Sequence, residues 1–449
     1  MCKATWEVKR DSYRVSIVCQ QKRGKRFPKT RGRNPMKNNI PDSKKVQQQI
    51  EQYTLRITEG LNKRKKKFIG QVLFGIQAAR DIKLSNIARS LKEDIRLIKT
   101  ENRLSRQLQS EDLTQRINSV LIADSQWRIK DDTVLALDLS DVHKPFAKKM
   151  EGLAKVWDGS KGEPADGYWL CEVIAAQVDK EALVPLYSEL YSHKVAGFES
   201  ENEQILKAIR MVSAKTKGRG IWAMDRGCDR HILVEELGRL KQSFVIRLRG
   251  DRHFTDPYGH ERKIPNLVRS IKYTEHYQIS IDREGCQENV RVQLGTKENL
   301  FIEGVEVRLI VIKGFGREPM LLMSNVDKSA RQILEIYLTR WKCEEAFRFL
   351  KHEYHLEDVR VRRYQSIRNT VALLHAVFYF VSVCLGQRLR MSILLRKIIE
   401  RSKRFFEVPV FKHYAVADGI YRLLFNMRWE EHEPNIDKEQ SKQLSFGFG

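Results

Sequence analysis

Two short apolar segments of this 449-residue chain each end in an aspartate, and they constrain the fold more than any other feature. TVLALDLSD leads from residues 133–137 into Asp138, and RGIWAMDRGCD leads from residues 221–224 into Asp225. Short apolar runs of this kind are typical of buried strands. Because the carboxyl ends of neighbouring parallel strands lie at one edge of a sheet, we expect the two carboxylates to meet there.

A third carboxylate belongs to the charged segment YLTRWKCEEAFRFLK. Tyr337, Arg340, Glu344 and Lys351 are spaced so that they share one face of an α-helix, which turns by about 100° per residue. On such a face Glu344 can hold a divalent metal ion. The side chains of Arg340 and Lys351 can bind phosphate oxygens, and the Tyr337 phenol can donate a hydrogen bond. An exposed helix with salt bridges has the same pattern, so the segment alone does not decide the matter.

The three acids together predict metal-assisted phosphoryl transfer. Asp138, Asp225 and Glu344 supply oxygen ligands for two Mg²⁺ or Mn²⁺ ions about 4 Å apart, which can bind the attacking and leaving oxygens of a phosphodiester. Asp141 is a rival of Asp138, and Glu345 is a rival of Glu344. The end of the apolar run favours Asp138, and the shared helical face favours Glu344.

Three polar residues near these acids have other expected roles. Asp229 follows Asp225 by four residues and is predicted to cap the next helix. His143 and Lys144, in DVHKP, are suited equally to DNA contact and to an ordinary surface loop.

The pattern Tyr-x2-Arg-x3-Glu-x6-Lys resembles the signature of a subgroup of bacterial insertion-sequence transposases of the DDE class. Tyr337, Arg340, Glu344 and Lys351 match it at every spacing, and the resemblance extends over about residues 63–369. It implies that the three acids are the catalytic, metal-binding triad. It also implies that the other signature residues hold phosphates near the cleaved transposon end.

Around the second acid the chain departs from the family pattern. The family often has Asp-Arg-Glu-Ala-Asp, whereas Gly227 and Cys228 stand here between Arg226 and Asp229. Arg226 therefore remains a candidate DNA contact, without a carried-over role in handling a flipped base. The resemblance implies strand cleavage and transfer into target DNA, with or without a hairpin intermediate. An inactive DNA-binding regulator descended from a transposase, or a metal-dependent DNA nuclease, remains an alternative.

Charge agrees with a nucleic-acid partner. The formal net charge is +25, and residues 1–70 hold 20 Lys and Arg against 5 Asp and Glu. Because two transposon ends must be joined, we expect a homodimer on DNA. Seven scattered cysteines without a Cys-x2-Cys pair argue against a zinc site and a disulfide framework. The apolar run at 371–385 is too short to span a bilayer, so we expect a buried helix and a cytoplasmic, nucleoid-associated protein.

The expected fold class is α/β: a ribonuclease H-like catalytic domain with a β-rich insertion, flanked by helical N- and C-terminal regions. The order β-β-β-α-β-α-β from residue 133 onward comes from the residue pattern, and the resemblance supplies the name of the fold. The expected units are a basic flexible arm (1–62), a helical DNA-binding domain (63–130), the catalytic domain (131–250 and 326–364), the insertion (251–325) and a helical C-terminal region with a flexible tail (365–449).

Two expectations concern the ends of the chain. Met36 is an alternative start to Met1, because the recognisable pattern begins only after the basic arm. The terminal KQLSFGFG loosely resembles the short peptide by which replication-associated proteins dock on the bacterial sliding clamp, although an unstructured end is favoured.

Overall fold

The computed structural model describes residues 41–158, 162–283, 286–386, 389–402 and 412–430, together with the two-residue strand β1 (Arg14–Val15). The alternative start at Met36 and the proposed clamp-binding tail lie outside the described residues.

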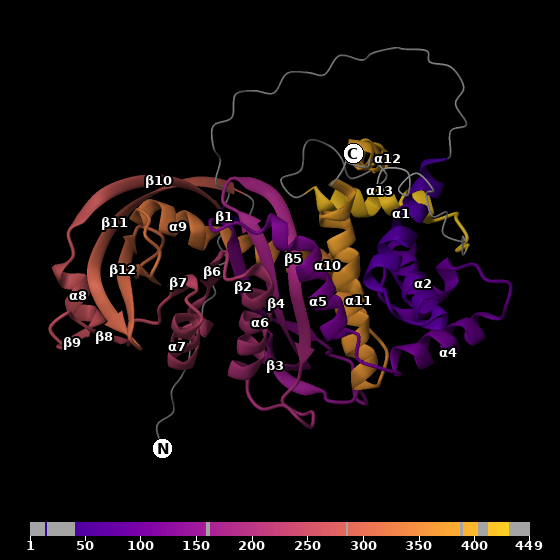
Figure 1. The fold of residues 1–449 in the computed structure, drawn as a ribbon, viewed down its shortest axis with the longest axis horizontal. Helices are drawn as coiled ribbons and strands as arrows, with labels where there is room; N and C mark the ends of the chain where they lie inside the picture. The colour runs from indigo at the N-terminus through magenta and orange to yellow at the C-terminus, as the bar shows by residue number, and fades with distance from the viewer. Residues whose placement is uncertain are drawn as a thin grey trace, which may run out of the picture.

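A large mixed sheet crosses the molecule, with helices on both faces and a helical region on one side (Figure 1). Its centre is parallel: β2 (Val134–His143) pairs with β6 (Ile221–Met224), and β6 pairs with β7 (Ser243–Arg247). These strands are nearly continuous apolar runs because both faces of the sheet are covered.

The other edge of this centre is antiparallel. Strand β2 pairs with β4 (Glu163–Gln177), and β4 pairs with both β3 (Ala154–Asp158) and β5 (Lys180–Tyr191). The predicted order lacked β5, so four strands and not three precede the first crossover helix. Strand β5 contains Pro185, and proline within a strand occurs mainly at sheet edges and at irregularities. Such an irregularity is present here, because the β4–β5 register shifts between Val173 and Ile174, and Ile174 is the partner of Pro185.

Residues 253–324, within the expected insertion, form antiparallel strands and one short helix. The last of them, β13, pairs with β7 and so extends the central sheet toward the long curved strands at the left of Figure 1. Its elements are β8 (His253–Thr255), β9 (Glu261–Lys263), α8 (Ile264–Ser270), β10 (Tyr273–Arg283), β11 (Cys286–Ile302), β12 (Val305–Lys313) and β13 (Met320–Ser324).

Three apolar cores hold these layers together. Helices α6 (Glu201–Thr216) and α7 (His231–Arg239) pack on one face of the central strands, and α9 (Ala330–Thr339) packs on the other face beside the insertion. Helix α10 (Trp341–Glu353) belongs to the third core, which joins β2 and β4 to the helical region.

The helical region combines both ends of the described chain. Helix α11 lies between β5 and the N-terminal helices, as the expected buried helix (Figure 1). Burial lowers the pKa of its His375 to about 3. In the described part of the chain, no helix is long and apolar enough to cross a bilayer. The helices are α1 (Asp42–Ile57), α2 (Lys63–Ala79), α3 (Leu84–Ser90), α4 (Leu97–Leu108), α5 (Thr114–Ser125), α11 (Tyr364–Ser382), α12 (Leu389–Arg401) and α13 (His413–Leu424).

Helix α1 falls within the segment predicted as a flexible arm. Val46, Ile50, Tyr53 and Ile57 recur every three to four residues and are buried. The glutamines and lysines between them made the segment look polar overall, but the apolar stripe is sufficient to order it against the other helices.

Candidate active site

The two strand-borne aspartates lie side by side. The parallel ladder between β2 and β6 ends with the pair Leu137 and Met224, and Asp138 and Asp225 are the next residue on each strand. The sequence suggested that Asp138 ends its strand. Strand β2 instead continues to His143 through its antiparallel pairing with β4. The end of the parallel ladder, and not the end of β2, brings the acids together.

Local hydrogen bonds fix both carboxylates. Asp225 accepts a hydrogen bond from the backbone N–H of Gly227 at 2.8 Å and thereby caps the short 3₁₀ turn η2 (Arg226–Cys228). Asp138 accepts one from the Ser140 hydroxyl at 3.3 Å. Each acid is therefore oriented before any ligand binds.

The third acid stands just after a break between two helices. The sequence predicted one continuous helix for the whole signature, but α9 ends and α10 begins at Arg340. The Arg340 N–H donates to the Tyr337 carbonyl, three residues back, at 3.1 Å, and the Arg340 carbonyl accepts from Cys343 at 2.9 Å. These short closures replace the regular helical pattern, so Tyr337 belongs to α9 while Glu344 and Lys351 belong to α10.

Arg340 bridges two of the three acids. Its guanidinium donates to Asp138 at 3.1 Å and to Glu344 at 2.7 Å, and the residue is only 5% exposed. These bonds bring together residues that lie about two hundred positions apart. The bridge places a positive charge where the two carboxylates converge.

The electrostatics of Asp138 show how close the acids are. Its pKa is raised to about 7: burial is the largest cause, the charge of Arg340 opposes it, and the charges of Glu344 and Asp225 add to it. The charges of Glu344 and Asp225 thus affect the pKa of Asp138, so the three carboxylates lie near one another. A site with such an excess of negative charge is suited to divalent cations.

A fourth carboxyl group faces Asp138 from the next strand. Glu172 on β4 is the register partner of Asp138 and is 2% exposed. Burial, followed by the negative charge of Asp138, raises the pKa of Glu172 to about 8. At neutral pH Glu172 is therefore mainly protonated and adds little negative charge to the site.

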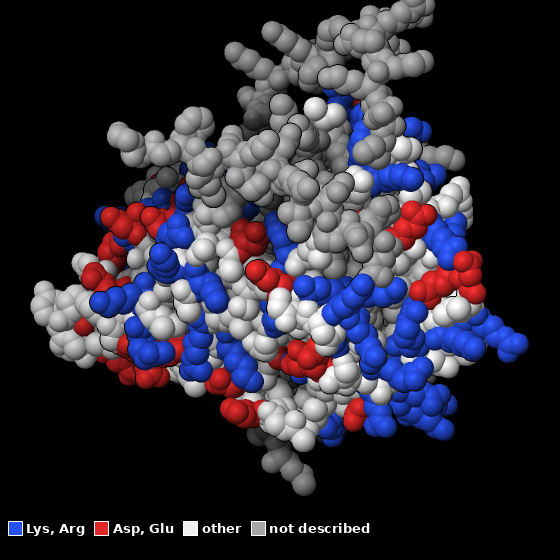
Figure 2. Space-filling view, turned by 45° about the vertical axis from the view of Figure 1, so that its right-hand side comes forward, with Lys and Arg blue, Asp and Glu red and all other residues white. Residues whose placement is uncertain are grey.

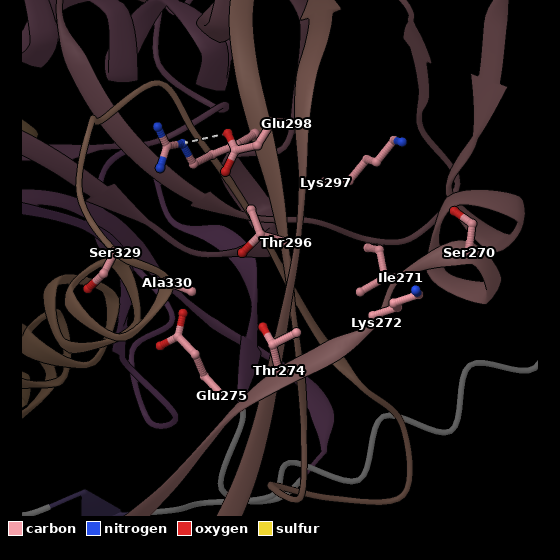
Figure 3. A pocket seen from close by; sticks show the side chains of 11 residues that line it. Ser270, Ile271, Lys272, Thr274, Glu275, Thr296, Lys297, Glu298, Ser329 and Ala330 are labelled. Atoms are coloured by element: carbon pink, nitrogen blue, oxygen red, sulfur yellow. Dashed lines mark ion pairs between the residues drawn. The ribbon is translucent and has the colours of Figure 1, made fainter.

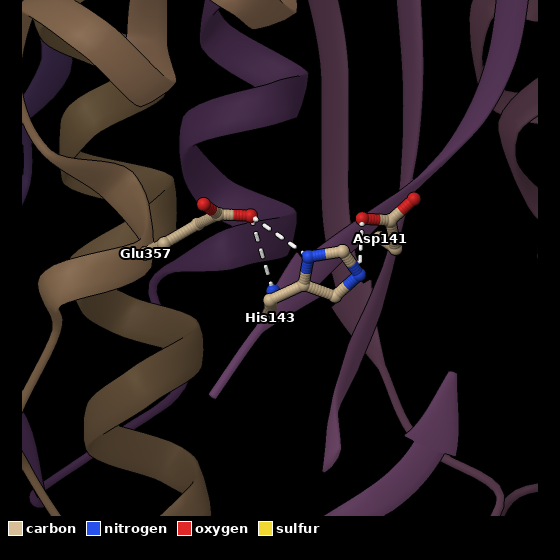
Figure 4. A group of neighbouring side chains, drawn as sticks. All are labelled: Asp141, His143 and Glu357. Atoms are coloured by element: carbon tan, nitrogen blue, oxygen red, sulfur yellow. Dashed lines mark hydrogen bonds and ion pairs between the residues drawn. The ribbon is translucent and has the colours of Figure 1, made fainter. Parts of the chain in front are cut away.

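A second cluster surrounds Lys351, the last residue of the signature. Asp141, His143 and Glu357 bring potential ligand atoms within 4.8 Å of one another (Figure 4). The Lys351 ammonium lies 3.3 Å from Asp141 and 2.7 Å from Glu357, and His143 lies 2.9 Å from Asp141. A cation already satisfies both carboxylates, so this cluster is a closed polar network.

The expected triad does not reach that mutual spacing. Among the described residues, potential ligand atoms lie within 4.8 Å of one another in Asp141, His143 and Glu357, but not in Asp138, Asp225 and Glu344. The physical reason is the Arg340 guanidinium, which lies between Asp138 and Glu344, together with the repulsion among three like charges.

The remaining predicted DNA contacts differ in exposure. Tyr337 is 1% exposed, with the Arg340 guanidinium 5.8 Å from the centre of its ring. Arg226 is exposed beside Asp225. Partial burial and the nearby charge of Arg247 lower the pKa of Arg226, with a smaller contribution from Arg249. Arg247 and Arg249 were missed, although the sequence RLR directly after the apolar run of β7 was a visible signal.

Asp229 does not cap the following helix as predicted. Arg230 is the N-cap of α7 and makes no side-chain capping bond. Asp229 accepts the backbone N–H of Arg249 at 2.9 Å and pairs with Arg252. It therefore anchors the segment after β7, which carries the arginines beside the site.

A polar hollow elsewhere on the molecule is separate from this site. It measures about 540 Å³ and lies on the insertion, between the start of β10, the middle of β11 and the start of α9 (Figure 3). Thr274, Glu275 and Thr296 line it, and Glu298 pairs there with Arg308 at 3.2 Å. None of the candidate acids contributes to its wall.

Comparison with known proteins identifies the family. Residues 129–380, more than half of the chain, match the family model described as the transposase DDE domain. The chain belongs to the DDE transposase family. The matched DDE domain contains the three acids and the complete signature.

Other comparisons are more distant. No curated protein matches the chain. One similar solved structure is the cryo-EM structure of the piggyBac transposase synaptic complex with hairpin DNA. The similarity covers 90% of this DDE transposase and 82% of that chain, with 10% sequence identity and a TM-score of 0.39.

Proposed function

We propose that this member of the family is a DNA transposase of the insertion-sequence type, in the subgroup with the Tyr-x2-Arg-x3-Glu-x6-Lys signature. Asp138, Asp225 and Glu344 form its catalytic, metal-binding triad. The observation that carries the proposal is the Arg340 bridge between Asp138 and Glu344, with Asp225 beside Asp138 at the end of the parallel ladder.

The strand order supports a ribonuclease H-like catalytic core. The central strands run in the order β5, β4, β2, β6, β7, with three parallel strands at one side and an antiparallel meander at the other. In this core the acids follow the paired parts of adjacent parallel strands, which is where α/β sheets place their ligands.

The donor set fits divalent cations. Three carboxylates supply hard oxygen ligands, and the pKa of Asp138 is raised first by burial and also by the charges of Glu344 and Asp225, which a cation would neutralise. Two Mg²⁺ or Mn²⁺ ions, when bound, supply Lewis acidity and a water of lowered pKa. Asp138, Asp225 and Glu344 would hold these ions beside the scissile phosphate.

The neighbouring cations bind and orient the DNA backbone. Arg340 exchanges its bonds to Asp138 and Glu344 for bonds to phosphate oxygens, since a planar guanidinium binds phosphate in two places. Lys351 grips the next phosphate as a point charge, and Arg226 contacts the backbone beside Asp225. Tyr337 packs under Arg340 and limits where the guanidinium can move.

Transposon-end DNA and target DNA are the proposed partners, bound by a homodimer that holds two ends together. Figure 2 shows Lys and Arg side chains gathered on the helical part of the face in view. The helical domain at 63–130 contributes exposed cations, including Lys63, Arg64, Lys99 and Arg106. These suit contact with backbone phosphates.

A cleavage assay tests the proposal. Labelled duplexes from the DNA flanking the gene are incubated with the protein, Mg²⁺ and a target plasmid. Asp138→Asn, Asp225→Asn and Glu344→Gln are each expected to reduce cleavage by at least about a thousandfold. Glu345→Gln, the adjacent acid on α10, is the matched control and keeps activity.

The outcomes separate the alternatives. Cleavage followed by joining to the plasmid supports a transposase. Cleavage without joining identifies a metal-dependent nuclease, and end binding without cleavage by the wild-type protein identifies a regulator. Full activity of Glu344→Gln contradicts the assigned triad.

A further inference from the structure

Beyond Lys351 the surface continues as two paired chain segments, residues 144–151 and 357–363. The backbone N–H of Glu151 donates to the Arg362 carbonyl at 2.9 Å, which joins the far ends of the segments. At their near ends the Lys144 ammonium donates to the carbonyls of Glu357, at 2.6 Å, and of Val359.

The buried Lys144 side chain holds the two segments together. It is 7% exposed, and its backbone N–H also donates to the Asp166 carbonyl of β4 at 2.7 Å. Burial lowers the pKa of its ammonium to about 8. Burying a charged ammonium costs free energy, which an ordinary surface loop has no need to spend. The bonds of Lys144 also fix the turn that follows.

That turn presents a phenylalanine to solvent. The Ala147 N–H donates to the Lys144 carbonyl at 3.0 Å, so residues 144–147 form a β-turn with Pro145 at its second position and Phe146 at its third. Phe146 is 94% exposed, more than any other large hydrophobic side chain among the described residues. A ring this exposed contributes little to folding, yet Lys144, the first residue of the turn, is bonded to β4 and to the segment after α10.

The two paired segments that carry this turn are rich in exposed cations. Lys148, Lys149, Arg360, Arg362 and Arg363 are all exposed on the two paired segments. Within the described chain no ion pair joins any of the five to an acid. The three acids on these segments have other partners: Asp358 pairs with Lys83 at 2.6 Å, Glu357 pairs with Lys351 at 2.7 Å, and Glu151 accepts the Tyr364 N–H at 2.9 Å. The two segments therefore carry five exposed cations without an ion pair and one exposed aromatic side chain.

The surface also adjoins the proposed active site. His143, the last residue of β2, lies 2.9 Å from Asp141, which pairs with Lys351. From Asp138 to His143 the strand covers about 17 Å at roughly 3.4 Å per residue. A DNA strand that passes from the acids over Lys351 would next reach Phe146.

We propose that Phe146 stacks on a base of the bound DNA end, several nucleotides from the scissile phosphate, while the five cations hold the adjoining backbone. Proteins bind unpaired nucleotides with this combination of an aromatic platform and flanking cations. The inference rests on the proposed function in one respect only, because it requires that DNA occupy the site.

Fluorescence can test the stacking directly. 2-Aminopurine is placed at successive positions near the end of the labelled duplex, in a Glu344→Gln background so that DNA stays uncut. Phe146 is expected to change the fluorescence at one or two adjacent positions. Phe146→Ala should abolish that change and weaken binding about tenfold, whereas Phe146→Trp should preserve both.

Two controls accompany these variants. Phe425→Ala removes another exposed phenylalanine, the C-terminal cap residue of α13, and should leave affinity and fluorescence unchanged. The double variant Lys148→Ala and Lys149→Ala should reduce the slope of log Kd against log salt by about two. Melting temperatures verify that each variant is folded.

The possible failures are distinguishable. If wild-type protein cleaves the DNA but Phe146→Ala binds with unchanged affinity and fluorescence, the stacking proposal is overturned and the proposed function stands. If wild-type protein cleaves no DNA but the signal still depends on Phe146, the surface binds nucleic acid and the enzymatic assignment fails.

Discussion

Glu172 lies directly opposite Asp138 across the ladder between β2 and β4. Two buried carboxyl groups thus face each other beside the candidate metal site, and the pKa of each is raised by burial and by the other acids around it. Because the pKa of Glu172 is about 8 and that of Asp138 about 7, Asp138 is the first of the pair to lose its proton as pH rises.

This pair predicts how stability depends on pH. The unfolded chain loses the Glu172 proton near 4.5, whereas the folded chain keeps it until about 8. Between these values the folded state binds more protons, so stability falls as pH rises. Glu172→Gln removes this loss and should raise the melting temperature at pH 8 more than at pH 5. Glu163→Gln, on the exposed end of the same strand, should show no such difference.

A second prediction concerns Arg340. Arg340→Gln leaves Asp138 and Glu344 without their bridging cation, which should lower the free energy of unfolding by about 3 kcal/mol in the absence of metal. Mg²⁺ should recover part of this loss, because it can replace the missing positive charge. Urea titrations with and without Mg²⁺ measure the effect. Arg348→Gln on α10 is the control, and an equal loss with and without Mg²⁺ would argue against metal binding by these acids.

A third prediction concerns the restraint on Lys351. Glu357 and Asp141 both pair with its ammonium, so part of its charge is neutralised before DNA binds. Glu357→Gln should tighten DNA binding, on the order of threefold, while Lys351→Ala weakens it. Glu345→Gln changes the net charge equally and should have little effect. Fluorescence anisotropy with end DNA measures all three, and equal tightening by both glutamine variants would mean that net charge alone is responsible.

A fourth prediction concerns the attachment of α11 to the N-terminal helices. The buried Asn369 side chain accepts the Leu113 N–H at 2.8 Å and donates to the carbonyls of Leu108, at 2.8 Å, and Glu111, at 2.6 Å. Asn369→Ala should destabilise the protein by about 3 kcal/mol, since these three bonds and a fourth, from the Gln365 side chain at 3.2 Å, are lost and buried groups remain unpaired. Gln365→Ala, one turn away, should cost much less. Chemical denaturation provides the comparison.

The sequence was informative where local pattern and sheet geometry agree. Two apolar runs ending in Asp138 and Asp225 were sufficient to predict neighbouring carboxylates, because few arrangements of buried parallel strands are possible. The buried helix around His375 was predictable for a similar reason. Its apolar run is too short to span a bilayer, so its side chains must be buried in a protein core.

Other features depend on contacts between distant segments. The break at Arg340 could not be inferred from a helical projection, which assumes one continuous helix. The network of Asp141, His143 and Glu357 joins residues more than two hundred positions apart, and no local spacing encodes it. Strand β5 was missed because its proline has the appearance of a loop residue until its edge position is known.

The helix break at Arg340 also bears on when the site is completed during translation. Helix α9 packs with the insertion, and α10 packs with the helical region, so the bridging guanidinium stands between two cores. A ribosome makes Asp138 and Asp225 well before it makes Arg340 and Glu344. Under the proposed triad, an unfinished polypeptide therefore holds an incomplete set of carboxylates until residues 340–344 have been translated and α10 has docked.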